Sequence, residues 1–273
     1  MSATTPTIDA SAAEGATKPG FWRTSVGINL LRALLVIAFL VAWELASGRI
    51  ISKFWASSPT AIFEVLQRWI GNGSLWLHLQ ATLAAMGAGY VIGCAAGVSA
   101  GLLLGFLPRV QRVLSPFLSA VYSIPKIALA PLFVIALGIG IESKIGLVAI
   151  TVFFLVLFAT LDGIRDVDAD FIEALELMGA TRREIASKLI LPAAKPWILT
   201  GMRISVRYAM TAAILGEVIA ANSGIGFLIE YNSGQFNASG VFAAVLLLVL
   251  LGVALTEFLT RFERGKEPVD LKP

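Results

Sequence analysis

Apolar residues gather in long runs along the chain, and charged or turn-forming residues bound each run. Six of these runs approach the ~20 residues with which an α-helix crosses the hydrocarbon layer of a membrane. Backbone groups in lipid must be hydrogen-bonded within the protein, so runs of this length predict helices rather than barrel strands. The predicted spans are 29–47, 81–106, 113–137, 145–164, 197–220 and 239–262. The expected fold class is all-α, a polytopic membrane protein with six transmembrane helices.

The composition supports a membrane protein and argues against a metal site or an enzyme. Hydrophobic residues make up 57% of the chain and charged residues only 14%, against about 25% charged residues in soluble domains. Cys94 is the single cysteine, so no intrachain disulfide forms, and no Cys/His cluster has metal-ligand spacing. For the single histidine, His78, we expect a hydrogen-bonding role. No nucleophile, base and orienting group fall within one site, so we expect no catalysis. The lipid bilayer, not a nucleic acid, is the expected non-protein partner.

The ends of the chain and its basic residues predict the topology. Residues 1–24 are expected to form a disordered tail, 25–264 the transmembrane domain and 265–273 a second tail. With the N-terminus inside, thirteen Lys and Arg residues fall on cytosolic segments, against four outside. Basic residues are enriched on the cytosolic side of membrane proteins, so both termini are predicted to be cytosolic. The segment between them is expected to form a bundle embedded in lipid.

Residues 59–70, between the first two spans, predict an amphipathic helix on the outer surface. Ile62, Phe63, Leu66, Trp69 and Ile70 recur at helical spacing among polar residues. The pattern leaves open whether this helix lies in the lipid headgroups or packs against the bundle.

The second span carries five glycines at intervals of four residues. One stripe of this helix therefore has no side chains, and another helix can approach it closely. The packing partner is expected to be a helix of the same subunit or of a second copy. The stripe consists of Gly89, Gly93, Gly97, Gly101 and Gly105.

Prolines interrupt the third span. Pro116, Pro125 and Pro131 remove backbone donors and favour a kinked or broken helix near 123–126. Broken helices inside membranes often line cavities, because their freed backbone groups need partners. Pro125 and Lys126 are therefore candidates for a translocation pathway. The alternative for the lysine is that it reaches an interface or pairs with a carboxylate.

Charged residues in the fifth span are further pathway candidates. Arg203, Arg207 and Glu217 fall on nearly one face, because fourteen residues are close to four turns of ~3.6 residues. Charged groups inside membranes usually face protein or water, and two arginines favour an anion. A structural Arg/Glu pair is the alternative.

The longest predicted cytosolic segment, 165–196, contains two helix starts. Asp170 with Glu173 has the spacing of a capping box, and so does Thr181 with Glu184. Gly179 suits the left-handed position that ends a helix. The segment therefore predicts a helix, a tight turn and a second helix.

Both predicted helices are amphipathic. Phe171, Leu175 and Met178 share one face of the first, and Ile185 and Leu189 lie together on the second. A short amphipathic helix exposed to cytosol needs a covering surface. That surface is either the bundle itself or a partner protein.

The same segment resembles a known motif. Glu173-Ala174, then Gly179 six residues after the glutamate, then Leu191-Pro192 a further twelve on, resemble the EAA loop of permease subunits in prokaryotic ABC importers of the first structural type. The motif has a second alanine where this chain has Leu175, and an isoleucine where it has Leu189. Both changes keep an apolar side chain, so they affect only how exactly the segment would fit a groove on a partner protein.

The resemblance covers roughly 58–227. This part of the chain is similar to the nitrate, sulfonate, taurine and bicarbonate branch of these permeases. Other members of that branch carry pyrimidine precursors and aromatic acids. The matching residues are Pro59, Thr82-Leu83, Ser123-Ile124-Pro125, Ala130-Pro131-Leu132, Gly201-Met202-Arg203, Gly216-Glu217 and Gly224-Ile225-Gly226.

The resemblance implies how the segment acts. In the family, ATP closes two ATPase subunits, each ATPase grips one coupling helix, and two permeases rock between inward-open and outward-open states. The residues expected to contact the ATPase are Asp170, Phe171, Glu173, Ala174, Leu175, Met178, Gly179, Ala180, Thr181, Glu184, Leu191 and Pro192.

The implied partners and cofactors lie outside this chain. No Gly-x-x-x-x-Gly-Lys-Ser/Thr sequence occurs, so ATP and Mg²⁺ are expected in a separate ATPase, present in two copies. A second permease copy, by default identical, completes the pathway. A binding protein outside the bacterial inner (plasma) membrane is expected to dock on the outer ends, including 221–237, and to deliver a small anion.

Two other classes of protein use similar features. A secondary transporter or channel also has broken helices and membrane charges but needs no ATPase, and a membrane scaffold uses its loop only to recruit a partner. The EAA-like segment favours the importer. The residue pattern leaves the cargo open, and also whether the two permeases are identical.

Overall fold

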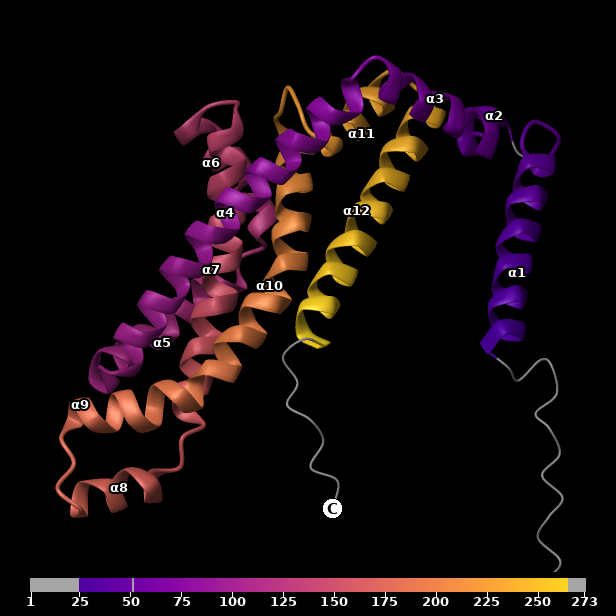
Figure 1. Ribbon diagram of the computed structural model, residues 1–273. Coiled ribbons are helices and arrows are strands. Elements are labelled where there is room, and N and C mark those ends of the chain that lie inside the picture. Colours follow the sequence, from indigo (N-terminus) through magenta and orange to yellow (C-terminus); the bar gives the residue numbers. More distant parts are fainter. Residues whose placement is uncertain (1–24, 51, 265–273) are drawn as a thin grey trace, which may run out of the picture. The chain divides into compact units, whose positions relative to one another are not determined.

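The computed structural model describes residues 25–50 and 52–264. The predicted tails, 1–24 and 265–273, lie outside the described residues. The regular elements of the described chain are all helices, which confirms the all-α fold class (Figure 1). Five of its helices are long and apolar enough to cross a membrane, and a bent helix pair supplies a sixth span if it is counted as one. The five helical stretches are 28–46, 74–105, 141–165, 182–219 and 238–261.

Of the described residues, 25–50 and 52–60 belong to a compact unit of their own. In α1 (Ser25–Ala46), side chains 28–42 are all exposed within this unit. The indole Nε1 of Trp43 donates to the carbonyl of Ala56, at the end of α2 (Lys53–Ala56), at 3.1 Å. The Glu44 carboxylate accepts from the backbone N of Thr60 at 3.1 Å and from its hydroxyl at 2.8 Å. These bonds tie α1, within this unit, to the end of α2 and to Thr60, near the start of α3 (Pro59–Gly71).

The predicted amphipathic helix exists as α3 and packs against the bundle. Ile62 and Val65 are each 5% exposed, and Trp69 packs against a cluster that contains Ile225. The buried face is rotated from the predicted one, because Phe63 is 61% exposed. Only the outward face of α3, which includes Phe63, is therefore available to the lipid headgroups.

The second compact unit is built on three helices that pack side by side: α4 (Ser74–Gly105), α7 (Ile141–Arg165) and α10 (Leu191–Ile219) (Figure 1). Val148, Val152 and Val156 of α7 and Ala209 and Ala213 of α10 are fully buried in the core between them. α7 contacts both other helices along its length and forms the middle of the core.

The glycine stripe of α4 faces α7 of the same subunit, which settles its packing partner. A Cβ built on Gly93 would lie 2.7 Å from the carbonyl oxygen of Ala149 and 2.7 Å from Cβ of Val152. Gly97 and Gly101 meet Val156 and Thr160 in the same way. Each glycine thus receives one β-branched residue or carbonyl of α7, and the two backbones approach closely enough for dispersion to hold them in lipid.

The predicted third span is broken. α5 (Pro108–Ser123) and the following pair, η3 (Lys126–Leu129) and α6 (Ala130–Leu137), meet at an angle of 85°. The break lies at Pro125, as expected. Pro116 does not break α5, and Pro131 lies in the first turn of α6, where no backbone donor is required.

The second span is longer than predicted. α4 begins at Ser74, because left-handed Gly73 (φ 76°) turns the chain directly from α3 into it. Its 32 residues make a helix of about 48 Å, longer than the ~30 Å hydrocarbon layer.

The last two described helices are α11 (Ile225–Gly234) and α12 (Ala238–Arg264), which pack on each other. The Asn237 side chain accepts from the backbone N of Gly240 at 3.2 Å at the start of α12.

The α4–α7 seam predicts opposite outcomes for two glycines of one helix. Gly93→Ala is expected to lower the free energy of unfolding by about 1–3 kcal/mol, because its Cβ would meet backbone and a buried valine. Gly87→Ala, where no atom lies within 4 Å of the new Cβ, is expected to be neutral or stabilising by up to about 1 kcal/mol. Denaturant unfolding of both variants in the same micelles measures the difference. Equal losses would contradict close packing at this seam.

Candidate functional site

The segment singled out by the sequence forms two short helices at one end of the second unit, α8 (Ala169–Leu177) and α9 (Arg182–Ile185) (Figure 1). The predicted capping box of Asp170 and Glu173 is wrong. The N-cap of α8 is Asp168, whose side chain accepts from the backbone N of Asp170 at 3.0 Å. Asp168 has the extended backbone that an N-cap requires, so the helix starts before Asp170, and Asp170 becomes a first-turn residue.

Gly179 ends α8 as predicted. Its φ of 85° is left-handed, and its backbone N donates to the carbonyl of Glu176 at 2.9 Å. The backbone N of Ala180 donates to the carbonyl of Leu175 at 3.0 Å, which completes a Schellman motif. This pair of bonds sets the angle at which α8 meets α9.

The second helix start is confirmed, and the helix it opens is long. The hydroxyl of Thr181 accepts from the backbone N of Glu184, and the Glu184 carboxylate accepts from the backbone N of Thr181. α9, the π-helical turn η4 (Ala186–Ile190) and α10 then follow without a break, giving a continuous helical rod over 182–219.

The π-helical turn explains how two prolines fit inside this rod. Pro192 has no N–H to give to the carbonyl of Lys188, and in a regular α-helix its ring would clash there. Widening the helix over Ala186–Ile190 relieves that clash. Pro196 lies further along inside α10. The predicted segment therefore runs directly into a membrane span rather than ending before it.

Apolar side chains on α8 are left uncovered. Phe171 is 62%, Leu177 90% and Met178 82% exposed. Of the predicted face, Leu175 turns inward and, with Ala180, lines a hollow of about 280 Å³ beside Glu184 and Lys188. Leu177 lies outside the predicted face and is the most exposed of these residues. The remaining predicted contact residues Glu173, Ala174, Leu191 and Pro192 are also exposed.

Lys126 lies at the break between α5 and α6 and folds back over aromatic rings. Its Nζ donates to the carbonyl of Tyr122 and lies 4.0 Å from the centroid of the Tyr122 ring and 5.8 Å from that of Phe154. Pro125, just before it, is exposed. The lysine therefore caps a backbone carbonyl freed by the break, as expected where a helix opens inside a membrane.

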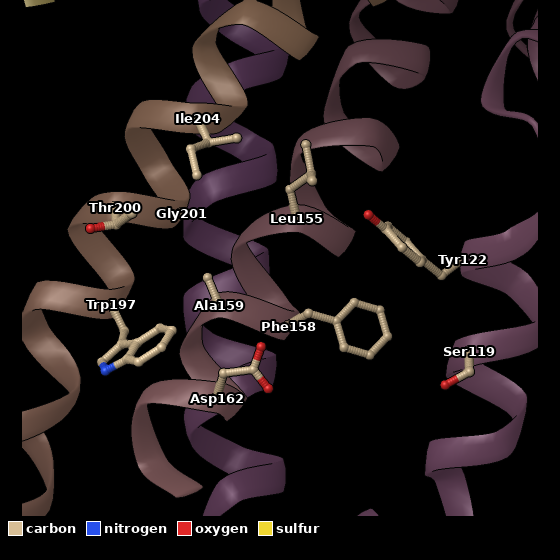
Figure 2. A pocket seen from close by; sticks show the side chains of 10 residues that line it. All are labelled: Ser119, Tyr122, Leu155, Phe158, Ala159, Asp162, Trp197, Thr200, Gly201 and Ile204. Carbon is tan, nitrogen blue, oxygen red and sulfur yellow. The ribbon is translucent and has the colours of Figure 1, made fainter. Parts of the chain in front are cut away.

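A cavity of about 400 Å³ lies among α5, α7 and α10, next to this break. Figure 2 shows Tyr122 of α5 and Phe158 of α7 pointing toward one another, and their rings meet edge to face at 5.0 Å. Trp197 points from α10 toward α7, and its Nε1 donates to Asp166 at 3.2 Å. The lining residues are Ser119, Tyr122, Leu155, Phe158, Ala159, Asp162, Trp197, Thr200, Gly201 and Ile204.

The sequence pattern pointed to a cavity beside the broken helix but did not identify its lining residues, because they come from three separate segments. Rings and apolar side chains form most of the wall, while Ser119, Asp162 and Thr200 add polar groups. A small molecule with a planar or apolar body and a few polar atoms fits such a lining.

Comparison with known proteins identifies the family. The sequence pattern described as "binding-protein-dependent transport system inner membrane component" matches residues 93–267, which include α8, α9 and the cavity. The chain belongs to this family. It is a permease subunit of an ABC importer, a multi-pass inner membrane component whose ATPase is a separate subunit and which works with a binding protein.

Curated permeases resemble the chain over most of its length. The formylaminopyrimidine transport permease protein of Halalkalibacterium halodurans is 34% identical over 81% of this chain and 88% of its own length. The putative aliphatic sulfonates transport permease protein of Bacillus subtilis is 32% identical over 86% of each chain. The taurine transport system permease protein of Escherichia coli is 31% identical over 86% of this chain and 87% of its own length.

A solved structure shares the fold of this permease. Inward-facing conformations of the MetNI methionine ABC transporter contain a chain that matches it with a TM-score of 0.61 and 23% identity. The match covers 73% of this permease and 97% of that chain.

The charged residues of α10 lie on two different faces of the permease. Arg203 and Arg207 are exposed, whereas Glu217 is 1% exposed and faces α4 and α11. The Glu217 carboxylate accepts from the hydroxyl of Thr82 at 3.0 Å. Glu217 and Arg207 are ten residues and thus about 80° apart around the helix, enough to separate the buried face from the exposed one.

Sequence analysis also missed that Lys144 is buried within the protein. It lies in α7, is 3% exposed, and its Nζ donates to the carbonyl of Ser223 at 2.9 Å. No local pattern marks this lysine as buried, because its partner lies 79 residues away.

The cavity predicts where water-soluble reagents reach the helices of the permease. With Cys94 replaced by serine, Ser119→Cys and Thr200→Cys are expected to react with a charged thiol reagent at least about tenfold faster than Thr160→Cys, because Thr160 is 0% exposed. Mass spectrometry of the purified protein in micelles measures the rates. Equal, slow rates at all three positions would mean that the cavity holds no water.

Proposed function

We propose that this permease forms the translocation pathway for a small organic or inorganic anion of the sulfonate, taurine, nitrate or bicarbonate type. A binding protein outside the membrane delivers the anion, and two copies of an ABC ATPase, which hold ATP and Mg²⁺, drive its passage. The observation that carries the coupling is the exposed apolar surface of α8, presented at the end of the rod that becomes α10.

The exposed residues of α8 support docking to the ATPase. Covering a phenylalanine, leucine or methionine side chain contributes about 1.5–3 kcal/mol each, so Phe171, Leu177 and Met178 offer several kcal/mol to a partner groove. The caps at Asp168 and Thr181 and the left-handed Gly179 hold α8 rigid before docking. Less ordering entropy is then lost on binding.

The basic residues at the α5–α6 break and on the exposed face of α10 support an anionic cargo. Lys126 lies beside Tyr122 of the cavity wall, and Arg203 and Arg207 lie exposed on α10. Arg207 also lines a groove between α10 and α12. We assign Pro125, Lys126, Arg203 and Arg207 to the pathway. Glu217 is buried and is not assigned to the pathway. The aliphatic sulfonate and taurine permeases that resemble this chain are named for anionic or zwitterionic cargo.

The basic residues support an orientation with both termini in the cytosol. In that orientation α8 and α9 face the cytosol, where an ATPase has access to ATP, and α3 and α11 lie on the outer side near the surface 221–237. One chain supplies one coupling segment, and a second identical copy supplies the other.

The turn at Gly179 provides a direct test of coupling. Gly179→Pro is expected to weaken copurification of the ATPase and to slow uptake by about tenfold or more, because proline fixes φ near −65° and lacks the N–H that bonds Glu176. Gly179→Asn, which tolerates a left-handed backbone, is expected to retain most activity. Uptake that persists in the proline variant, with no ATPase bound to either protein, would instead support a secondary transporter or a scaffold.

The cargo is tested at Lys126 and at the binding protein. Lys126→Gln is expected to slow anion uptake about tenfold while ATPase copurification is unchanged, and Lys126→Arg is expected to retain uptake, because only the charge is required. Calorimetry of the binding protein with sulfonates, taurine, nitrate and bicarbonate identifies the anion. A preference for a cation or a neutral sugar would contradict the anion proposal.

A further inference from the structure

The turn 223–226, which opens α11, is held through its main chain by side chains of three other helices, at the end of the second unit opposite α8. Four consecutive residues each give one backbone group to this arrangement. The bonds are Lys144 Nζ to the carbonyl of Ser223 at 2.9 Å, the backbone N of Gly224 to His78 Nδ1 at 3.1 Å, that of Ile225 to Thr82 Oγ1 at 2.9 Å, and that of Gly226 to Glu217 Oε2 at 2.9 Å. We call the four side chains His78, Thr82, Lys144 and Glu217 the turn clamp.

The turn is shaped around the Glu217 carboxylate. Gly224 has a left-handed φ of 119°, and a Cβ on this residue would overlap the carboxyl group. A Cβ on Gly226 would lie 2.5 Å from the carbonyl of Ile214 and 2.8 Å from Cβ of Glu217. Only glycines let the backbone come this close to the acid.

Three of the four clamp side chains are deeply buried, His78 is partly exposed, and burying polar groups is costly. Thr82 is 0%, Glu217 1% and Lys144 3% exposed. Glu217 Oε1 has no hydrogen-bond partner within the part of the chain that the structure describes. Apolar side chains of similar size often fill such a space with equal or greater stability, whereas a hydrogen-bonded polar cluster admits few arrangements. The clamp therefore selects one position of the turn more than it adds stability.

Glu217 also stands near the far end of the rod that begins beside α8. The rod runs from Arg182 to Ile219, and its 38 residues span about 57 Å. Its first turn carries the Thr181–Glu184 capping box, and its last turn carries the clamp carboxylate. After the rod, residues 220–223 have no helical structure, so α11 is held beside the rod by the clamp together with the packing of α11 against α10, α12 and α4.

We propose that Thr82, His78, Lys144 and Glu217 are positioning residues that fix α11 to the rod, so that a displacement of α8 and α9 moves α11 and the surface 221–237 as well. This inference rests on the proposed function, in which an ATPase moves α8 and a binding protein docks near α11. The clamp makes the two ends of the permease one rigid body. Signals from a docked, loaded binding protein then reach the ATPase through the same rod.

A pair of buried threonines tests the clamp. Thr82→Val keeps the shape of the side chain but leaves the backbone N of Ile225 without its acceptor. Thr160→Val is the matched control. Thr160 is also 0% exposed, but among the described residues its hydroxyl bonds only the carbonyl of Val156 in its own helix, at 2.7 Å. Thr82→Ser, which retains the hydroxyl, is the conservative variant expected to restore function.

The readout is ATPase activity of the complete transporter, with and without its loaded binding protein. In Thr82→Val, stimulation by the binding protein is expected to fall about tenfold, while basal activity and ATPase copurification stay within about twofold of the unsubstituted complex. Thr160→Val and Thr82→Ser are expected to retain stimulation. Full stimulation in Thr82→Val, or an equal loss in Thr160→Val, would overturn the proposal.

Hydrogen exchange separates this inference from the proposed function. The amides of Ile225 and Gly226 are expected to exchange at least about tenfold faster in Thr82→Val than in Thr160→Val, in the permease alone. Unchanged protection would show that the clamp does not hold the turn. If the unsubstituted complex binds no ATPase, or no binding protein stimulates it, the proposed function fails and transmission fails with it, whatever the exchange rates show.

Discussion

The close approach of α4 and α7 is the constraint on which the rest of the fold depends. In lipid, two apolar helices gain little from burying apolar surface, so they must associate through contact of their backbones and small side chains. The glycines of α4 allow this contact, and the valines of α7 fill the groove they leave. With α7 fixed, α10 packs against it. The turn clamp then takes its position from α4, α7 and α10, and the cavity takes its position from α7, α10 and α5.

Around this core the chain departs from regular helix at three places, and each departure satisfies its backbone groups differently. At the α5–α6 break, Lys126 bonds the freed carbonyl of Tyr122. At Pro192, the π-helical turn lets the rod continue. At 223–226, side chains of α4, α7 and α10 bond the backbone groups of the turn. Because an unsatisfied backbone group is costly away from water, each departure from regular helix keeps its backbone groups partnered.

Local signals in the sequence were sufficient for the spans, the Pro125 break, the glycine stripe, the Thr181–Glu184 box and Gly179, because each rests on residues close together in the chain. The N-cap of α8 was misjudged by two residues, since Asp168 and Asp170 both suit a cap and only backbone geometry separates them. The cavity and the turn clamp lay beyond sequence reasoning. Their residues come from segments far apart in the chain. In the turn clamp, for example, 79 positions separate Lys144 from Ser223 and 146 separate His78 from Gly224, and no local pattern records such pairs.

The face assignment on α10 shows why periodicity alone was insufficient there. Arg203, Arg207 and Glu217 lie within one broad sector of the helix, but the boundary between buried and exposed positions runs through that sector. Ala209, Ala213 and Glu217 fall on the buried side, and the two arginines on the other. One helix thus carries two separate functions. Its exposed face can meet the cargo, while its buried face joins the coupling segment to α11, so substitutions that alter the cargo need not disturb the coupling.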